Sequence, residues 1–154
     1  MSAIEAEEAG TIVDPLQDML GYELRRASAA VMNTLATALE TLDLRWSEAS
    51  LLMILGTNPG CTQSEVARTL RVQPANLVPI INRLELLGAI RKTPKEGRAI
   101  ALVLTKAGEA LLKQVKQIIA RHEERLGRGL SPEAQAKLVK TLRAITKNAC
   151  CAED

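Results

Sequence analysis

The sequence of 154 residues contains no phenylalanine, one tyrosine and one tryptophan. A buried core must therefore consist of aliphatic side chains, and the abundant leucine, isoleucine, valine and alanine are typical of a mainly helical protein. No apolar run approaches the roughly 18 residues that span a bilayer, and the acidic first residues do not resemble a signal peptide. These absences exclude a membrane protein and predict a cytoplasmic one.

Cysteine and histidine are also scarce. Three cysteines, Cys61, Cys150 and Cys151, do not make a disulfide framework, and adjacent cysteines rarely bridge each other, so reduced thiols are expected. His122 has no second histidine and no cysteine or carboxylate at ligand spacing, so neither a metal site nor another cofactor is predicted. A phosphate loop, a nucleophile elbow and a paired acid–base constellation are absent too, which argues against an enzyme.

The formal net charge is only +2, but the charges are unevenly distributed. Residues 1–18 hold five acids and no base, whereas residues 62–106 hold eight lysines or arginines against three acids. Such a basic stretch indicates nucleic-acid binding where a DNA-binding fold accompanies it. By itself it is equally consistent with a solvated protein face.

Long amphipathic helices are expected on both sides of the chain's centre. Asp14 is expected to cap the first helix, with Pro15 at its first position and an apolar stripe that continues to Leu42. Further helix caps are expected at Ser47, Thr105 and Ser131. The first helix is too long for one small domain to cover, so it and the two C-terminal helices predict a homodimer interface. The alternative is a helix that packs across its own core.

The centre of the chain predicts two short helices joined by a tight turn. Thr62 and Glu65 have the spacing of a capping box at the start of the first helix, residues 62–70. The second, residues 74–87, carries an apolar stripe at helical spacing and ends before Gly88, where a left-handed C-cap favours glycine. This pattern is typical of a helix-turn-helix.

Two strands, residues 89–93 and 100–104, follow around a basic turn at residues 94–98. The fold class is therefore mainly α with a small β-hairpin wing: a winged helix-turn-helix with six helices, dimerised through its N- and C-terminal helices. The predicted organisation is an acidic tail (1–13), an N-terminal dimerisation helix (14–45), the winged helix-turn-helix DNA-binding domain (46–104) and C-terminal dimerisation helices (105–154).

Pro79 lies within the second helix of the helix-turn-helix, where it removes one backbone hydrogen bond. Two interpretations are open. Either the helix is bent at Pro79, or its regular part begins near Asn76 and Pro79 falls in the first turn.

Four stretches of the chain together resemble one known protein family in their order and spacing. They are residues 59–67, 82–91, 96–99 and 104–108. The chain thereby resembles the multiple antibiotic resistance regulator (MarR) family of bacterial transcription factors over roughly residues 15–150. The resemblance implies a homodimeric transcriptional regulator, in most cases a repressor, that binds a palindromic double-stranded DNA operator.

A helix that enters the major groove offers its N-terminal side chains to base edges. We therefore expect Gln73, Ala75 and Asn76 to read the operator, because glutamine and asparagine can pair with adenine and alanine allows close approach. Gln63 and Ser64, at the start of the preceding helix, are expected to contact phosphates.

Basic residues on and near the wing complete the predicted DNA interface. Arg83 either reaches a phosphate or remains a surface charge, while Lys92 and Lys95 supply sequence-independent attraction. The MarR resemblance implies that Arg98 enters the minor groove and that an acid, here Glu96, holds its guanidinium group.

In the resembled family, small aromatic anions often bind between the first helix and the winged domain and release the DNA. Tyr22 and Trp46 are the aromatic residues of this chain, and Arg25 and Arg26 follow Tyr22. An aromatic face beside a guanidinium suits an aromatic carboxylate or its CoA thioester as an effector. Alternatively, Trp46 anchors the next helix and the two arginines face solvent.

Two other functions are compatible with the same fold. A thiol-based redox regulator would use Cys61, which the dipole of the following helix could activate, although a small buried residue in that turn is the simpler interpretation. A winged helix can also serve as a protein-association module without binding DNA. Such a module has no need of basic residues on its wing.

Overall fold

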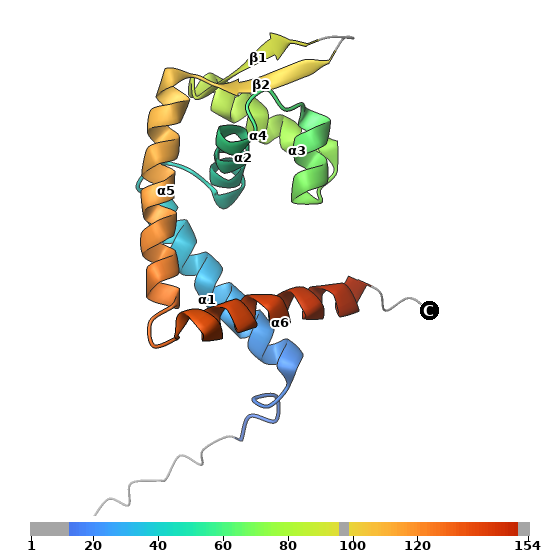
Figure 1. The fold of residues 1–154 in the computed structure, drawn as a ribbon, viewed down its shortest axis with the longest axis vertical. Coiled ribbons are helices and arrows are strands. Elements are labelled where there is room, and N and C mark those ends of the chain that lie inside the picture. The colour runs from blue at the N-terminus through green and yellow to red at the C-terminus, as the bar shows by residue number, and fades with distance from the viewer. Residues whose placement is uncertain (1–12, 96–98, 151–154) are drawn as a thin grey trace, which may run out of the picture. The chain divides into compact units, whose positions relative to one another are not determined.

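The computed structural model describes residues 13–95 and 99–150. Within them it has six helices and one two-stranded sheet (Figure 1). In chain order these are α1 (Leu20–Glu40), α2 (Trp46–Thr57), α3 (Gln63–Leu70), α4 (Pro74–Leu86), β1 (Ile90–Pro94), β2 (Ile100–Leu104), α5 (Lys106–Leu126) and α6 (Pro132–Cys150). The predicted mainly helical winged helix-turn-helix is confirmed. The chain forms two compact units, which divide within α1 between Thr34 and Leu35.

The start of α1 differs from the prediction. The Asp14 carboxylate accepts a hydrogen bond from the backbone N–H of Leu16 at 2.9 Å, and residues 15–18 form a turn. An aspartate that bonds the backbone two residues onward stabilises a turn in place of a helix. The helix therefore begins at Leu20, and the expectation that Asp14 caps it is wrong.

The start of α2 differs as well. Its N-cap is Arg45, not Ser47, because the carboxylate of Glu48 accepts the backbone N–H of Arg45 at 2.7 Å. An arginine side chain has no acceptor, so only the glutamate half of a capping box forms there.

The helix-turn-helix follows the prediction closely. Thr62 Oγ1 accepts the N–H of Glu65 at 3.3 Å, and Glu65 Oε2 accepts the N–H of Thr62 at 2.6 Å, which completes the capping box. Gly88, with φ of 68°, follows α4. The N–H groups of Gly88 and Ala89 reach the carbonyls of Glu85 and Leu84, each at 2.9 Å. This is a Schellman motif, in which glycine avoids the strain of a left-handed residue.

Pro79 lies in the interior of α4, which begins at Pro74. The interpretation that places Pro79 in the first turn is therefore wrong. Because Pro79 has no N–H, the carbonyl of Ala75 lacks its usual helical partner. Leu87, expected at the end of the buried stripe, caps the helix and is 44% exposed.

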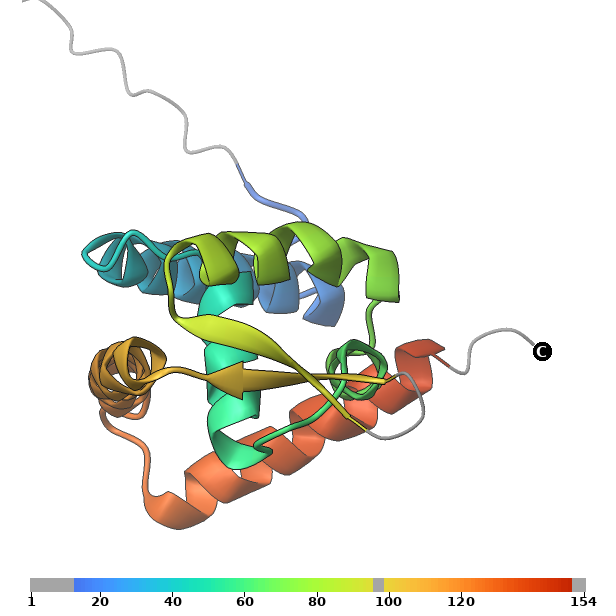
Figure 2. The same cartoon turned by 90° about the horizontal axis from the view of Figure 1, so that it is seen from above.

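The core of the second unit is aliphatic and gathers around α2. Helix α2 contacts α4, α5 and β2, and Figure 2 shows the hairpin crossing over it. Strands β1 and β2 pair antiparallel, with Ile90 opposite Leu104 and Pro94 opposite Ile100. Fully buried side chains from several elements meet in this core: Leu39, Leu51, Leu52, Leu55, Val66, Leu77, Ile81, Leu84, Leu102 and Val115.

Thr105 joins the hairpin to α5, as predicted. Its hydroxyl accepts the N–H of Gly108 at 3.0 Å and donates to the carbonyl of Gly88 at 2.6 Å. A Cβ at Gly108 would lie only 1.9 Å from the carbonyl oxygen of Ala89, so only glycine permits this close approach. The start of α5 is thereby fixed to the end of α4.

Helix α6 begins as predicted, with Ser131 Oγ accepting the N–H of Ala134 at 3.2 Å. It buries none of its side chains in the single chain. Its exposed apolar residues include Leu138, Val139 and Leu142. In the part of the chain that the structure describes, no helix is long and apolar enough to span a bilayer.

Candidate nucleic-acid interface

The N-terminal end of α4 is open to solvent. Gln73 is the N-cap and Pro74 the first helical residue, so the chain enters the helix with φ already fixed. The side chains predicted to read bases, on Gln73, Ala75 and Asn76, are all exposed. The free N–H groups of a helix start add a partial positive charge at the same place. This end of α4 is therefore accessible, and its contacts with DNA stay a prediction.

Helix α3 supports that end. Gln63 Nε2 donates to the carbonyl of Pro74 at 2.7 Å and ties the first turn of α3 to the first residue of α4. The same side chain keeps its carbonyl oxygen and a second N–H for other partners. Ser64 beside it is exposed. Gln63 thus has a positioning role in addition to the predicted phosphate contact.

The two wing lysines have different environments. Lys92 Nζ lies 2.7 Å from Glu85 Oε2, so a carboxylate already balances its charge. Lys95 Nζ donates to the neutral carbonyl of Gly60 at 3.2 Å, and its charge acts on Glu65 over a longer distance than a direct ion pair. Lys95 therefore offers the stronger attraction for a phosphate. Arg98 and Glu96 lie outside the described residues.

Arg83 has protein partners that the sequence did not reveal. One terminal nitrogen, Nη2, lies 2.9 Å from Asp43 Oδ2 and donates to the carbonyl of Asp43 at 2.8 Å. Its Nε lies 2.7 Å from Glu48 Oε1 as an ion pair, without hydrogen-bond alignment. The hydrogen bond to Asp43 and the charge of Glu48 raise the pKa of the guanidinium group. Arg83 is therefore engaged within the protein, which neither a phosphate contact nor a free surface charge anticipated.

A signal for the buried partner was present in the sequence. Glu48, Leu52 and Leu55 recur at the spacing of one helix face, and Glu48 is 2% exposed. A carboxylate inside an apolar stripe requires a hydrogen-bonded or charged partner, because an unpaired buried charge is very unfavourable. Which residue supplies that charge depends on the packing of α4 on α2.

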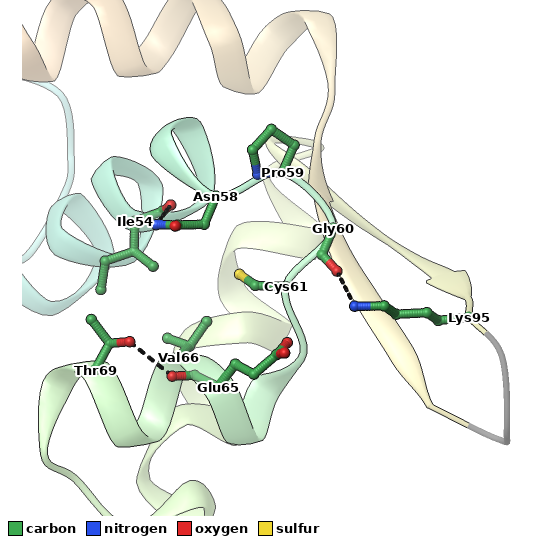
Figure 3. A pocket seen from close by; sticks show the side chains of 9 residues that line it. All are labelled: Ile54, Asn58, Pro59, Gly60, Cys61, Glu65, Val66, Thr69 and Lys95. Atoms are coloured by element: carbon green, nitrogen blue, oxygen red, sulfur yellow. Dashed lines mark hydrogen bonds between the residues drawn. The ribbon is translucent and has the colours of Figure 1, made fainter.

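A cavity of about 390 Å³ lies between the end of α2, helix α3 and the wing (Figure 3). Cys61 faces it from the loop before α3, and Lys95 reaches its rim from β1's end. Burial, and next the charge of Glu65, raise the pKa of the Cys61 thiol. A reactive sensor thiol needs the opposite shift, so the geometry favours a structural Cys61 over a redox switch.

In the first unit, the aromatic and basic residues predicted for an effector site are partly paired with one another. The guanidinium carbon of Arg26 lies 5.6 Å from the ring centroid of Tyr22, a cation–π distance. Arg26 also pairs with Glu23 at 3.2 Å, and the Tyr22 hydroxyl donates to Asp14 at 3.3 Å. Arg25 is exposed.

Trp46 belongs to the second unit, as the first residue of α2. It is 41% exposed in the single chain, which leaves both interpretations of Trp46 open. Cys150 is exposed and reduced, while Cys151 lies outside the described residues. His122 is buried on α5, and among the described residues no group of three histidines, cysteines or carboxylates could hold a metal ion.

Comparison with known proteins agrees with this geometry. The family model described as "MarR family" matches residues 42–99, which extend from the end of α1 to the wing. The transcriptional repressor CouR, in a structure bound to a 23-mer DNA duplex, is 33% identical with a TM-score of 0.79. That match covers 85% of this chain and 94% of the other. A CouR structure bound to p-coumaroyl-CoA is 31% identical, with a TM-score of 0.77 and coverage of 88% and 97%.

A second similar protein is the HTH-type transcriptional repressor Rv2887 of Mycobacterium tuberculosis. It is 28% identical over 128 residues, which are 82% of this chain and 92% of that one. Its structure in complex with salicylic acid has a TM-score of 0.63 and coverage of 82% and 95%. These relatives are regulators of transcription rather than enzymes.

Proposed function

The chain belongs to the MarR family of transcriptional regulators, and from this premise we propose that it is a repressor that binds a palindromic operator as a homodimer. One observation carries the proposal. The N-terminal end of α4 presents Gln73, Ala75 and Asn76 to solvent, in a fold shared with a repressor captured on DNA. Two such ends in a dimer match two half-sites of a palindrome.

In this proposal, base edges and phosphates have different partners. Gln73 and Asn76 pair with adenines in the major groove, and Ala75 contacts a thymine methyl or allows close approach. Ser64, Gln63 and Lys95 contact phosphates of the DNA backbone, and the N-terminal dipole of α3 strengthens these contacts. Arg98 of the wing enters the adjacent minor groove.

Homodimerisation is supported by apolar surface that a single chain leaves exposed. Leu138, Val139 and Leu142 of α6 are between 39% and 48% exposed, and Leu20 and Met32 of α1 are 64% and 37% exposed. Apolar residues at helical spacing on terminal helices are suited to burial against a second copy.

We further propose an aromatic carboxylate, or its CoA thioester, as the effector that releases the operator. The similar repressors are found with p-coumaroyl-CoA and with salicylic acid. Within the first unit, Tyr22 supplies aromatic surface, and Arg25 and Arg26 supply cations for a carboxylate or phosphate. Thiol sensing by Cys61 is not favoured, because burial makes its thiolate less available.

Gel retardation with the DNA upstream of the chain's own gene tests the function directly. We expect the purified dimer to retard this DNA, and Asn76→Ala to weaken binding by about 1–3 kcal/mol, the range for loss of one bidentate base contact. Gln117→Ala, on the exposed surface of α5, is the control and should bind like the parent. Absence of any retardation at low salt would contradict the proposal.

Addition of salicylate or p-coumaroyl-CoA to the retarded complex tests the effector class. Release of DNA by either compound, and loss of that release in Arg25→Ala, is the expected result. If the same concentration of effector releases DNA from Arg25→Ala as from the parent, Arg25 is not part of the effector site.

A further inference from the structure

We propose that Arg83 is a positioning residue, which fixes the DNA-reading helix α4 to the segment between α1 and α2 and thereby sets operator affinity without contacting DNA. The inference rests on the proposed function in one respect, that α4 reads the operator. Asp43 and Glu48 are the two partners through which Arg83 acts, and the three residues are named here the Arg83 clamp.

Asp43 binds Arg83 with two groups at once. Its carboxylate lies 2.9 Å and its backbone carbonyl 2.8 Å from the same guanidinium nitrogen. An exposed ion pair alone holds little, and the Asp43 side chain is 88% exposed. The backbone carbonyl of Asp43 holds Arg83 more firmly than the side chain does, because it belongs to a rigid backbone segment.

That segment is the turn that follows α1. The N–H of Leu44 donates to the carbonyl of Leu39 at 3.3 Å, and the N–H of Asp43 donates to that of Glu40 at 3.0 Å. Leu39 and Leu44 are buried in the core, at 0% and 3% exposure, and so hold Asp43 from both sides. The position of the carbonyl is therefore fixed by the core and not by a mobile loop.

The backbone of Asp43 is itself unusual. Its φ is 53°, in the left-handed region where a helix C-cap normally has glycine. Aspartate tolerates this region better than most residues but less well than glycine. A carboxylate at this place gains a contact that glycine cannot provide, which is the ion pair with Arg83.

Glu48 connects the clamp to α2. One of its oxygens accepts the N–H of Arg45, at the start of α2, and the other faces Arg83 Nε, each at 2.7 Å. Glu48 is 2% exposed, so the guanidinium group of Arg83 is the charged partner that the packing provides for this buried side chain. Arg83 thus joins α4 to both the turn that follows α1 and the start of α2.

The site of attachment explains why the clamp affects DNA reading. Arg83 lies nine residues after Pro74, about 13 Å along the helix axis from the reading end. A small rotation of α4 about Arg83 displaces Gln73 and Asn76 by more than it displaces the residues next to Arg83. Base contacts depend on distances of a few tenths of an ångström, so a loosened clamp lowers operator affinity.

Asp43→Asn provides the sharpest test, because charge and geometry predict opposite results. Asparagine keeps the tolerance for positive φ but removes an acid, which on charge alone should strengthen DNA binding. The clamp predicts weaker operator binding, by up to about fivefold, the most that an exposed ion pair contributes, because the bond to the backbone carbonyl remains. Arg83→Lys, which keeps the charge but loses the fork, should weaken binding similarly. Glu123→Gln, an exposed acid on α5, is the charge-matched control.

The salt dependence of operator binding separates positioning from a phosphate contact. If Arg83→Gln weakens binding with an unchanged slope of log affinity against log salt, Arg83 is not a phosphate ligand. A slope smaller by about 0.9, with tighter or equal binding by Asp43→Asn, would overturn the proposal.

Hydrogen exchange of α4 tests the clamp without DNA. Faster exchange of α4 amides in Asp43→Asn and Arg83→Gln than in Glu123→Gln is expected, together with altered fluorescence of Trp46, the chain's one tryptophan. Unchanged exchange in both variants would refute the clamp. If the parent protein retards no DNA, the proposed function fails, yet the exchange result still decides whether the clamp exists.

Discussion

At the scale of single residues, hydrogen bonds keep one carboxylate of the helix-turn-helix ionised. It belongs to Glu65, whose Oε2 lies 2.6 Å from the backbone nitrogen and 2.9 Å from the hydroxyl of Thr62. The hydrogen bonds from the backbone and side chain of Thr62, with the charge of Lys95, lower the pKa of the Glu65 carboxyl below its ordinary value of 4.5. The start of α3 is therefore stabilised by an ionised glutamate.

This gives a pH-dependent prediction. A carboxyl whose pKa is lower in the folded than in the unfolded state stabilises the protein above the unfolded-state pKa. That stabilisation is lost as the pH falls through the folded value. Thermal unfolding of the parent and of Glu65→Gln, from pH 7 to pH 3, should show a difference at pH 7 that disappears towards pH 3. Parallel curves over the whole range would contradict the assignment.

Thr62→Ala removes the other half of the capping box and should lower the free energy of unfolding by about 1 kcal/mol at pH 7.

At the scale of elements, α4 combines well-formed ends with a defect in its interior. Pro74 occupies the first helical position, where its missing N–H has no helical partner to lose, whereas Pro79 is interior. Pro79 is exposed, so burial of its ring contributes little to offset the lost hydrogen bond. A helix that reads DNA therefore contains a local weakness beside its reading end.

Pro79→Ala should stabilise the protein. The substitution restores the bond to the Ala75 carbonyl, worth up to about 3 kcal/mol, less the roughly 1 kcal/mol by which proline restricts the unfolded chain. Denaturant unfolding should thus give a free energy of unfolding higher by roughly 2 kcal/mol. Pro74→Ala is the matched control and should leave it unchanged or slightly lower. A loss of stability in Pro79→Ala would indicate that α4 requires the proline.

At the scale of the whole molecule, one helix of the single chain has no buried side chain. Helix α6 buries no residue although Leu138 and Leu142, one turn apart, are apolar. The double substitution Leu138→Lys with Leu142→Lys should convert a dimer into a monomer at micromolar concentration, as measured by sedimentation. Helix formation itself should persist, because lysine is a good helix former. Lys140→Ala, elsewhere on α6, should remain dimeric.

The sequence by itself determined the elements and most of their ends. The Thr62–Glu65 capping box, the turn at Gly88, and the caps Thr105 and Ser131 act through bonds between residues three to five positions apart, so their spacing in the chain contains the information. Prediction was wrong where two local patterns competed, as at Asp14, which stabilises a turn, and at Ser47, since Glu48 reaches back to Arg45. The predicted reading residues of α4 are exposed, as expected, but their contacts with DNA stay a prediction.

Only the tertiary structure decided which polar side chains are engaged within the protein. Arg83 and Asp43 are 40 residues apart, and Gln63 and the Pro74 carbonyl are 11 apart across a turn. No periodicity encodes such pairs, because they depend on how helices pack after they have formed. The physical reason is the range of the interactions: capping and amphipathicity act along one helix, whereas a buried charge takes its partner from whichever helix lies against it.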